Sequence, residues 1–541
     1  ARAVVGPDPF DAMGRALALA KERLGGGSEP AYHVAYALNE TRTLTLQGTH
    51  GAVAAVQRNH RRTGDVDLRV GSAKLDHTHK LRDASWWSES PRPTLDAPLY
   101  DAGKALFELF VRGTDDTYRA ARRRLIKVRA NASVKVERAD ASDDFSPAPV
   151  VVVSEPPARL QVDEAAWTAL VREASALYLK YPAIMDSAVQ LAVTEERRWL
   201  ADSDGIRVHD GRNHLRVATW ADTVAADGMQ LQIYDYVDVA SVDHLPARDA
   251  VLAMVKAAAE RVTALHDAPL IEPYSGPAIL RGRAAGVFFH EIFGHRVEGH
   301  RQKDEDEGQT FTHRVGEAVL PPFLSVLDDP TVARLGDVDL NGHYRWDDEG
   351  VAAERVQLVD RGVLRGFLLS RSPIEGFPKS NGHGRRQPGN AVVARQGNLM
   401  VEAHQTVPYA KLRDALVAEV KRQGKPFGLV FDDISGGYTF TGRSEPNAFT
   451  VQPVTVWRVY PDGRPDELVR GVDMIGTPLS TFAGILAAGD DRDVFNGVCG
   501  AESGWVPVSA SSPSLLVREV EVQRREKGND RPPLLAAPTE G

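Results

Sequence analysis

The sequence predicts an α+β protein in which an N-terminal α/β domain precedes a largely β C-terminal domain. Helical and strand patterns are segregated along the chain and do not alternate regularly, which argues against a doubly wound sheet. With 541 residues, 43% of them hydrophobic, the chain can bury a large core and form two or three domains, of which we take two. Residues 268–277 contain three prolines and a glycine, so we expect domains over residues 1–267 and 268–541.

The N-terminal half begins with a helix over residues 11–24, where apolar residues recur at helical spacing before a glycine run. Residues 32–38 and 42–47 show strand character, and we expect them to pair with each other. Residues 150–153 are β-rich, and further helices are expected over residues 163–179 and 247–265. These elements predict helices packed on a mixed sheet.

The C-terminal half is dominated by Gly-rich turns and short alternating strands. Strands are expected over residues 355–359, 363–369, 429–432 and 450–459. Helical patterns are few there, which is why this domain is predicted to be largely β.

Composition excludes several classes of partner. The formal net charge of −9 and the pI near 6.0 argue against binding to nucleic acid or to an anionic membrane, because both need clustered, uncompensated Lys and Arg. No apolar run approaches the roughly 18 residues that cross a bilayer, so we expect a soluble protein. The chain begins with Ala1 and not with Met. A cytoplasmic location is expected, and an exported protein whose signal was removed is the alternative.

Residues 284–295 form an apolar helical segment that carries His290, Glu291 and His295. Burying two imidazoles and a carboxylate without a purpose is costly, so these side chains indicate a site. A zinc hydrolase needs neutral imidazoles as ligands and a carboxylate that takes the proton of the activated water. We therefore expect His290 and His295 to bind Zn²⁺ and Glu291 to be the general base. The simpler alternative is that the histidines are hydrogen-bonded core residues.

The spacing of the two histidines predicts a local distortion. They lie five residues apart, whereas the shorter HExxH motif of zinc peptidases places them four apart. Five residues turn an α-helix by about 500°, which leaves the two side chains about 140° apart. A regular helix would thus separate the imidazoles, so we predict an interruption at Gly294, in the form of a π-bulge.

Two histidines leave a tetrahedral zinc site in need of one more protein ligand and an open position for water. His300, Glu298 and Cys499 are the candidates. His300 repeats the five-residue spacing, and a carboxylate such as Glu298 can also bind zinc. Cys499, the only cysteine, lies between glycines, and a thiolate is a strong zinc ligand, although one cysteine is equally compatible with a small buried apolar residue. The residues alone leave the choice open.

Several segments together resemble the TldD/PmbA family of zinc-dependent peptidases. The resemblance rests on Ala285-Gly286-Val287 before the His290-to-His295 motif, Glu298-Gly299, Leu327-Asp328-Asp329, Asp347-Asp348-Glu349-Gly350, Gly362-Val363-Leu364, Asn381-Gly382-His383-Gly384-Arg385-Arg386, Cys499-Gly500 and Val506-Pro507-Val508. It is close from about residue 270 onward and general before that, where this chain is longer than usual. In this family the catalytic TldD type carries HExxxH and a distant cysteine, and the PmbA (TldE) type lacks the zinc site. This chain is similar to the TldD type.

The resemblance implies a zinc site made of His290, His295 and Cys499, enclosed by the C-terminal domain, with Glu291 as general base. It also implies a homodimer, or a heterodimer with a PmbA/TldE-like subunit, that cleaves unfolded or extended peptides. Such a substrate would bind as an added strand.

Two other functions stay open at this point. One is a non-catalytic peptide-binding or scaffold subunit with a structural zinc site, in which His300 or Glu298 closes the coordination. The other is a different zinc hydrolase, such as an amidase, because the ligands do not specify the leaving group.

Overall fold

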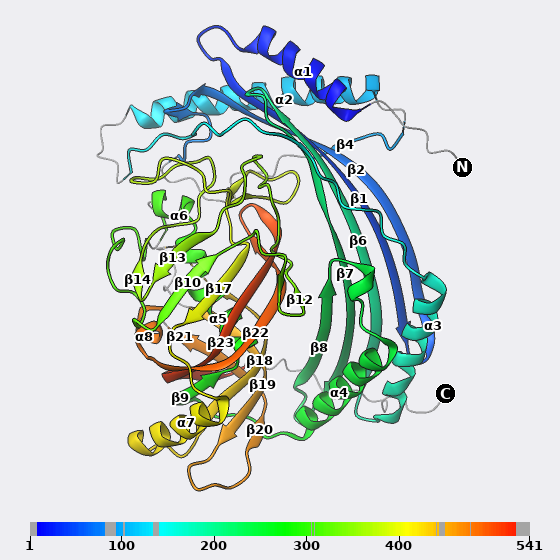
Figure 1. Cartoon of the computed structure of the whole chain (residues 1–541), viewed down its shortest axis with the longest axis vertical. Helices are drawn as coiled ribbons and strands as arrows, with labels where there is room; N and C mark the ends of the chain where they lie inside the picture. The colour runs from blue at the N-terminus through cyan, green and yellow to red at the C-terminus, as the bar shows by residue number, and fades with distance from the viewer. Residues whose placement is uncertain are drawn as a thin grey trace.

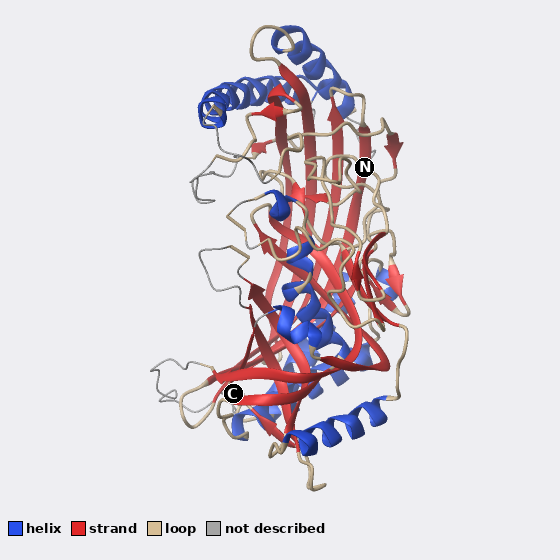
Figure 2. Ribbon diagram, turned by 90° about the vertical axis from the view of Figure 1, so that its left-hand side faces the viewer, coloured by secondary structure: helices blue, strands red, loops and turns tan. Residues whose placement is uncertain are grey.

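The computed structural model describes residues 8–81, 94–100, 103–133, 140–304, 306–307, 309–439, 441–442, 449–476 and 478–525. A long, strongly curved sheet runs along one side of the molecule, and the C-terminal half lies against its concave side (Figures 1 and 2). The predicted α+β class is confirmed. The predicted boundary after residue 267 stays a prediction, and residues 1–7 and 526–541 of the predicted domains lie outside the described part. Among the described helices, none combines the length and apolar character needed to cross a bilayer.

In the described N-terminal half, eight strands form one sheet in the order β3-β2-β1-β6-β7-β5, with β4 beside β2 and β8 beside β7. The strands are β1 (Ala31–Thr49), β2 (Ala52–Ser72), β3 (Leu75–Asp76), β4 (Leu95–Asp96), β5 (Val152–Ser154), β6 (Asp186–Asp202), β7 (Arg207–Val224) and β8 (Gln230–Val239). Only β5 runs parallel to its neighbour, so the sheet is mixed as predicted.

The expected pairing of residues 32–38 with residues 42–47 is wrong, because both belong to the single strand β1. The polar residues 39–41 between them keep the alternation of the strand. Glu40 is buried on the same face as Leu38 and binds Arg42 and Arg159 (3.1 and 2.9 Å). The turn comes later, at His50 and Gly51, whose successive positive φ values of 47° and 78° are typical of a type I′ hairpin.

Four helices cover one face of this sheet. They are α1 (Pro9–Leu24), α2 (Gly103–Ala132), α3 (Glu164–Ser175), which continues as a 3₁₀ turn (Ala176–Lys180), and α4 (Arg248–Asp267). The predicted helices are confirmed, and α2 was not predicted. α1 and α2 pack on Tyr36 and Leu38 at one end of β1, while α3 and α4 pack around Leu46 at the other end. Figure 1 shows the two pairs at opposite ends of the sheet.

In the described C-terminal half, eleven strands form a second sheet, in the order β14-β13-β10-β17-β23-β21-β19-β18-β9, with β20 beside β19 and β22 beside β23. Its strands are β9 (Tyr274–Leu280), β10 (Leu324–Asp328), β13 (Val356–Asp360), β14 (Val363–Leu364), β17 (Asn398–Ala403), β18 (Gly428–Thr439), β19 (Phe449–Val459), β20 (Glu467–Val469), β21 (Val472–Gly476), β22 (Ile485–Ala501) and β23 (Gly504–Arg524). Two small ribbons are β11 (Arg334–Leu335) with β12 (Val338–Asp339), and β15 (Gly384–Arg385) with β16 (Val393–Ala394). The strand expected over residues 363–369 is limited to β14; the other expected strands are present.

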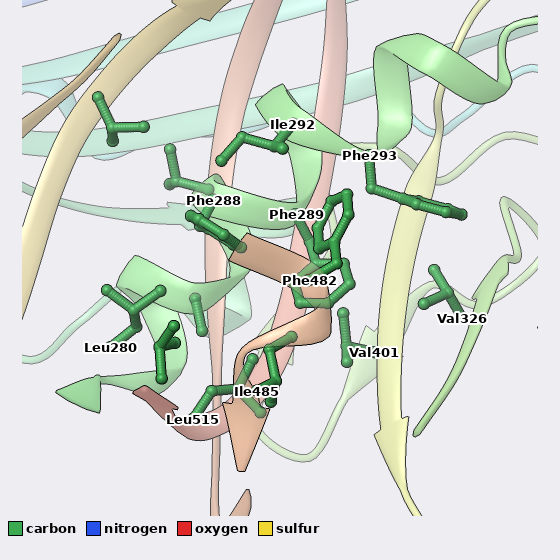
Figure 3. Close-up of a cluster of buried hydrophobic side chains, with 14 of the residues drawn as sticks. Leu280, Phe288, Phe289, Ile292, Phe293, Val326, Val401, Phe482, Ile485 and Leu515 are labelled. Carbon is green, nitrogen blue, oxygen red and sulfur yellow. The ribbon is translucent and has the colours of Figure 1, made fainter. Parts of the chain in front are cut away.

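The helices of this half are α5 (Gly282–Ile292), α6 (His300–Lys303), α7 (Tyr409–Gln423) and α8 (Pro478–Ala483). α5 lies at the centre of the core. Phe288 and Phe289 pack on Phe482 of α8, with ring centroids 6.0 and 5.5 Å apart, and Figure 3 shows Leu515 of β23 in the same cluster. Burial of such large side chains holds α5 between the sheet and α8.

A buried arginine joins the two halves of the chain. Arg371 is 1% exposed; it donates to Ser146 O at 2.9 Å and to the carboxylates of Asp202 and Asp204 at 3.5 and 3.1 Å. Its guanidinium also lies 4.1 Å from the centroid of the Phe145 ring. The same two carboxylates and His33 are grouped closely enough to hold a metal ion. The guanidinium already supplies their positive charge, so we assign them to the contact between the halves.

Replacing Arg371 by Ala is expected to lower the free energy of unfolding by about 3–5 kcal/mol, because it leaves the buried carboxylate of Asp202 without its cation. Urea unfolding measures the change. Arg345→Ala is the control, since Arg345 pairs with Glu155 across the same contact but both side chains are exposed, and it is expected to cost less than about 1 kcal/mol. Equal effects of the two substitutions would contradict the assignment.

Candidate metal centre

Two glycines allow α5 to lie directly on the sheet. A Cβ atom at Gly286 would be 2.8 Å from the carbonyl oxygen of Ala510, and one at Gly282 would be 2.8 Å from that of Ser512. Both carbonyls belong to β23, so any side chain at these positions would push the helix away from the strand. The close packing places the C-terminal end of α5, with His290, over the β22–β23 hairpin.

The helix ends before the second histidine. α5 stops at Ile292, Phe293 has φ −102°, and residues 294–297 form a separate 3₁₀ turn (Gly294–Val297). The predicted interruption is confirmed, but the predicted π-bulge is wrong. A 3₁₀ turn rotates by about 120° per residue and would not realign the side chains along one axis. The imidazoles nevertheless meet across this break in the helix, with ring centroids 5.1 Å apart.

The absence of a side chain at Gly294 is required by a contact with Gln396 and not by a backbone conformation that only glycine adopts. A Cβ atom there would lie 1.9 Å from Oε1 of Gln396, a side chain that is 1% exposed. Nε2 of Gln396 donates to the carbonyl oxygen of His290 at 3.3 Å. The absent side chain at 294 thus makes room for an amide that supports the last turn of α5.

The hairpin brings Cys499 to the two histidines. Cys499 lies on β22 opposite Val506 of β23, and its Sγ is 3.4 Å from Nε2 of His295. One ligand atom each of His290, His295 and Cys499 lie within 4.8 Å of one another. Donors around a tetrahedral Zn²⁺ are about 3.3–3.6 Å apart, given Zn–N and Zn–S bonds of about 2.0–2.3 Å. Two imidazoles and one thiolate are a donor set that zinc binds well, so these residues fit the ion.

The other nitrogen of His295 faces a buried carboxylate. Nδ1 is 3.2 Å from Oε2 of Glu298, whose side chain is fully buried. Arg301 Nε donates to the same oxygen at 2.9 Å, and Arg395 Nε lies 3.5 Å from Oε1. Burial alone would raise the pKa of Glu298, but His295, Arg301 and Arg395 lower it to about 2. The ionised carboxylate therefore holds the ring with Nε2 turned toward Cys499.

Arg395 connects the two segments that carry the cluster. Besides its contact with Glu298, its Nη2 donates to the carbonyl oxygen of Cys499 at 2.8 Å. Its Nη1 donates to Ser503 Oγ and Gly504 O, at 2.8 and 3.0 Å, in the turn of the hairpin. One guanidinium thus fixes the position of the thiol relative to His295.

Glu291 lies beside the cluster without being part of it. Its Oε2 is 3.9 Å from Nε2 of His295, and its side chain is 12% exposed. Burial raises the pKa of Glu291, and His290 and His295 only partly oppose this. Nδ1 of His290 is buried and, within the described part of the chain, has no hydrogen-bond partner. The cluster thus contains a buried polar atom whose hydrogen-bonding capacity is not satisfied.

The two other candidates for a third ligand point elsewhere. His300 pairs through Nε2 with Glu502, and Glu298 binds the side of His295 that faces away from Cys499. From the sequence, Glu298 was only a candidate third ligand, and its contact with Nδ1 was missed, although its position three residues after His295 was a signal. Nothing in the sequence pointed to Arg395 or Gln396, because they lie far along the chain.

The C-terminal half of the chain is similar to several known proteins. Residues 273–524 match the family model described as the PmbA/TldA metallopeptidase C-terminal domain. A metalloprotease from Archaeoglobus fulgidus is 30% identical over 253 residues, which cover 46% of this chain and 53% of that protein. A metalloprotease TldD homolog from Haemophilus influenzae is 29% identical over 252 residues, which cover 46% and 48%. The chain thus spans about half the length of the curated relatives that it matches.

Solved structures show the same fold over nearly the whole chain. TldE from Thermococcus kodakarensis has a TM-score of 0.59 and 12% identity, covering 95% of this chain and 100% of that one. A protein from Thermotoga maritima named as a modulator of DNA gyrase has a TM-score of 0.60 and 17% identity, covering 95% and 99%.

Residues 273–524 thus match the C-terminal domain of a metallopeptidase family, within an α+β fold that the solved structures share. The resemblance to the TldD/PmbA family that the sequence motifs predicted is confirmed over this range.

Replacing Gly294 by Ala is expected to cost about 1–3 kcal/mol of unfolding free energy, because the new methyl group overlaps the buried amide of Gln396. Gly436→Ala is the matched control: no atom lies within 4 Å of the position that its new methyl group would take, so a change within about 0.5 kcal/mol is expected. Urea unfolding compares the two variants with the parent protein. A Gly294→Ala protein as stable as the parent would refute the role given to this contact.

Proposed function

We propose that the protein is a zinc-dependent peptidase of the TldD type, in which His290, His295 and Cys499 hold the metal and Glu291 is the general base. The observation that carries the proposal is the approach of these three donors to within 4.8 Å of one another beside a buried carboxyl group. The name of another relative, a zinc metalloprotease TldD homolog from Saccharolobus solfataricus, supports the choice of metal.

In the proposed mechanism, each residue of the candidate site has one role. Bound zinc supplies Lewis-acid activation of a water molecule and of the scissile carbonyl. Glu291 accepts the proton of that water and passes it to the leaving amine, and burial raises the pKa of its carboxyl group toward the working pH. Glu298 keeps Nε2 of His295 turned toward the metal position, and Arg395 keeps the Cys499 strand in place.

Three protein donors leave one coordination position for water, as in catalytic zinc sites. A structural site would need a fourth protein ligand, and both residues considered for that position, His300 and Glu298, are engaged in other contacts. These contacts favour an enzyme with an open metal position over a scaffold with a structural zinc site.

We propose an extended peptide as the substrate. His290, His295 and Cys499 are 3%, 6% and 7% exposed, so the surface of a folded protein would not reach them, whereas an unfolded segment would. A strand added to a sheet edge is the expected mode of binding. We also propose a dimer, formed with a second copy or with a TldE-like subunit, since TldE shares the fold.

Glu291→Gln is expected to keep its zinc and to lose about 10²–10⁴-fold in peptide cleavage, because it removes the base and leaves the ligands. Cys499→Ser is expected to lose both zinc and activity. Elemental analysis measures the metal, and a mixed peptide library, with and without a TldE-like subunit, measures cleavage. His266→Gln, at the exposed end of α4, is the control and is expected to change neither. Full zinc and full activity in Cys499→Ser would remove Cys499 from the site.

Glu298→Gln is expected to weaken zinc binding by about 10–100-fold, because the amide has the size of the carboxylate but not its charge. Chelator competition measures the affinity. Glu502→Gln is the matched control: Glu502 pairs with the same Arg301 at 2.9 Å but is not the carboxylate that binds His295, and it is expected to have the smaller effect. If Glu502→Gln weakens zinc binding as much, the orienting contact of Glu298 is not the cause.

A further inference from the structure

The β22–β23 hairpin exposes large apolar side chains on the face opposite Cys499. Cys499 and Val506 form one cross-strand pair and are buried on the inner face, toward His295. On the outer face, Val498 is 51% exposed and Trp505 is 63% exposed. Successive side chains of a strand point to opposite faces, so both residues are next to the cysteine or its partner and still contact solvent.

The indole ring of Trp505 lies across the backbone of the opposite strand. Trp505 pairs with Gly500, and a Cβ atom at Gly500 would lie 2.8 Å from Cζ3 and 2.9 Å from Cη2 of the ring. The absent side chain lets the ring extend from β23 over β22, on the face that Val498 also occupies. Val498 and Trp505 together form an exposed apolar surface along β22, which we call the outer face of the hairpin.

Hydrogen bonds around the hairpin show which backbone groups of β22 point away from β23. The backbone N–H of Trp505 donates to Oε1 of Gln387 at 3.1 Å, and Pro507 has no N–H. Their partners Gly500 and Val498 therefore belong to cross-strand pairs without mutual hydrogen bonds. In such pairs the N–H and C=O groups of both residues point away from the partner strand.

The edge of β22 is covered at Asn496 and open beyond it. The carbonyl of Asn496, two residues before Val498, points the same way and accepts a hydrogen bond from the hydroxyl of Tyr236. Among the described residues, no strand pairs with this side of β22 between residues 497 and 501, and no backbone hydrogen bond joins Val498 or Gly500 to a residue outside the hairpin. An open strand edge binds an extended peptide through such groups.

We propose that Trp505 and Val498 select peptides that carry a large apolar side chain beside the bond to be cleaved. The peptide pairs with the open edge of β22 at Val498 and Gly500. Its residue opposite Cys499 directs a side chain to the inner face, toward the metal position, and the residues on either side direct theirs to the outer face, against the indole ring. This inference rests on the proposed peptidase function and adds the class of substrate.

The size and position of the outer face favour a peptide over a second subunit as its occupant. A stable protein interface takes about 20–30 residues from each partner, whereas the apolar part of this face consists of Val498, Trp505 and the half-buried Pro507. Val498 directly precedes Cys499 in the sequence. A peptide residue held beside Val498 therefore brings its neighbour next to the proposed zinc ligand.

The test compares two short fluorescein-labelled peptides of Ala, Ser and Thr, one with a central Phe and the other with Ser in its place. Fluorescence anisotropy measures their binding to the Glu291→Gln protein, which leaves them uncut, and kcat/KM is measured in the parent protein. Trp505→Ala, introduced into both, is expected to lower binding and kcat/KM for the Phe peptide about tenfold more than for the Ser peptide, because one aromatic contact is lost. Its zinc content is expected to stay unchanged.

Tyr100→Ala is the control, since Tyr100 is an exposed aromatic residue of the N-terminal half, beside His60 of β2. It is expected to alter neither the binding of the two peptides nor their cleavage. Thermal unfolding checks that both variants fold.

Three results overturn the inference: no binding of the Phe peptide, equal losses for both peptides in Trp505→Ala, or no loss in that variant. If Trp505→Ala keeps the peptide preference but changes the oligomeric state, the outer face is a subunit contact. A parent protein that binds the Phe peptide and cuts neither peptide contradicts the peptidase proposal, and the binding comparison still decides the role of Trp505.

Discussion

The close contact between α5 and β23 is the constraint on which the candidate metal centre depends. Gly282 and Gly286 are four residues apart and therefore lie on one face of the helix, where neither has a side chain to separate it from the strand. Since β22 pairs with β23, the distance between α5 and β23 also sets the distance between α5 and β22. His290, on the helix, and Cys499, on β22, consequently meet although they are far apart in the sequence.

Packing alone would not orient the imidazoles. A buried carboxylate is costly unless cations and donors replace its water, and Glu298 obtains them from His295, Arg301 and Arg395. The same contacts attach the 3₁₀ turn to the hairpin that bears Cys499. Hydrocarbon side chains could fill this volume, but they would fix neither the tautomer of His295 nor the position of the thiol.

The residues of the candidate site that could be predicted from the sequence lie together in one short segment. His290, Glu291 and His295 share one segment, and their spacing alone implied that the helix breaks near Gly294. The contact of Gly294 with Gln396 was not predictable, because the fold brings Gln396 from about one hundred residues away. Cys499 was assigned through the family resemblance, and Arg395 was missed for the same reason as Gln396.

The errors in the predicted secondary structure have local causes. Residues 39–41 of β1 are polar and resembled a turn, but Glu40 is paired with arginines and keeps the strand intact. α2 was missed because Gly113 and Thr114 occupy part of its buried face, which weakens the apolar pattern. Propensity and hydrophobic pattern predict an element poorly where small or polar residues are buried by tertiary contacts.

Alternation along β1 separates the helices from the C-terminal half. Tyr36 and Leu38 face the outer helices, whereas Ala37 packs with Leu200 and Trp346 toward the C-terminal half. The C-terminal half, which carries the metal cluster, lies on the concave side of the sheet (Figure 1). A one-residue slip of β1 would exchange these faces, so the strand register keeps the C-terminal half, with its metal cluster, against the concave side of the sheet.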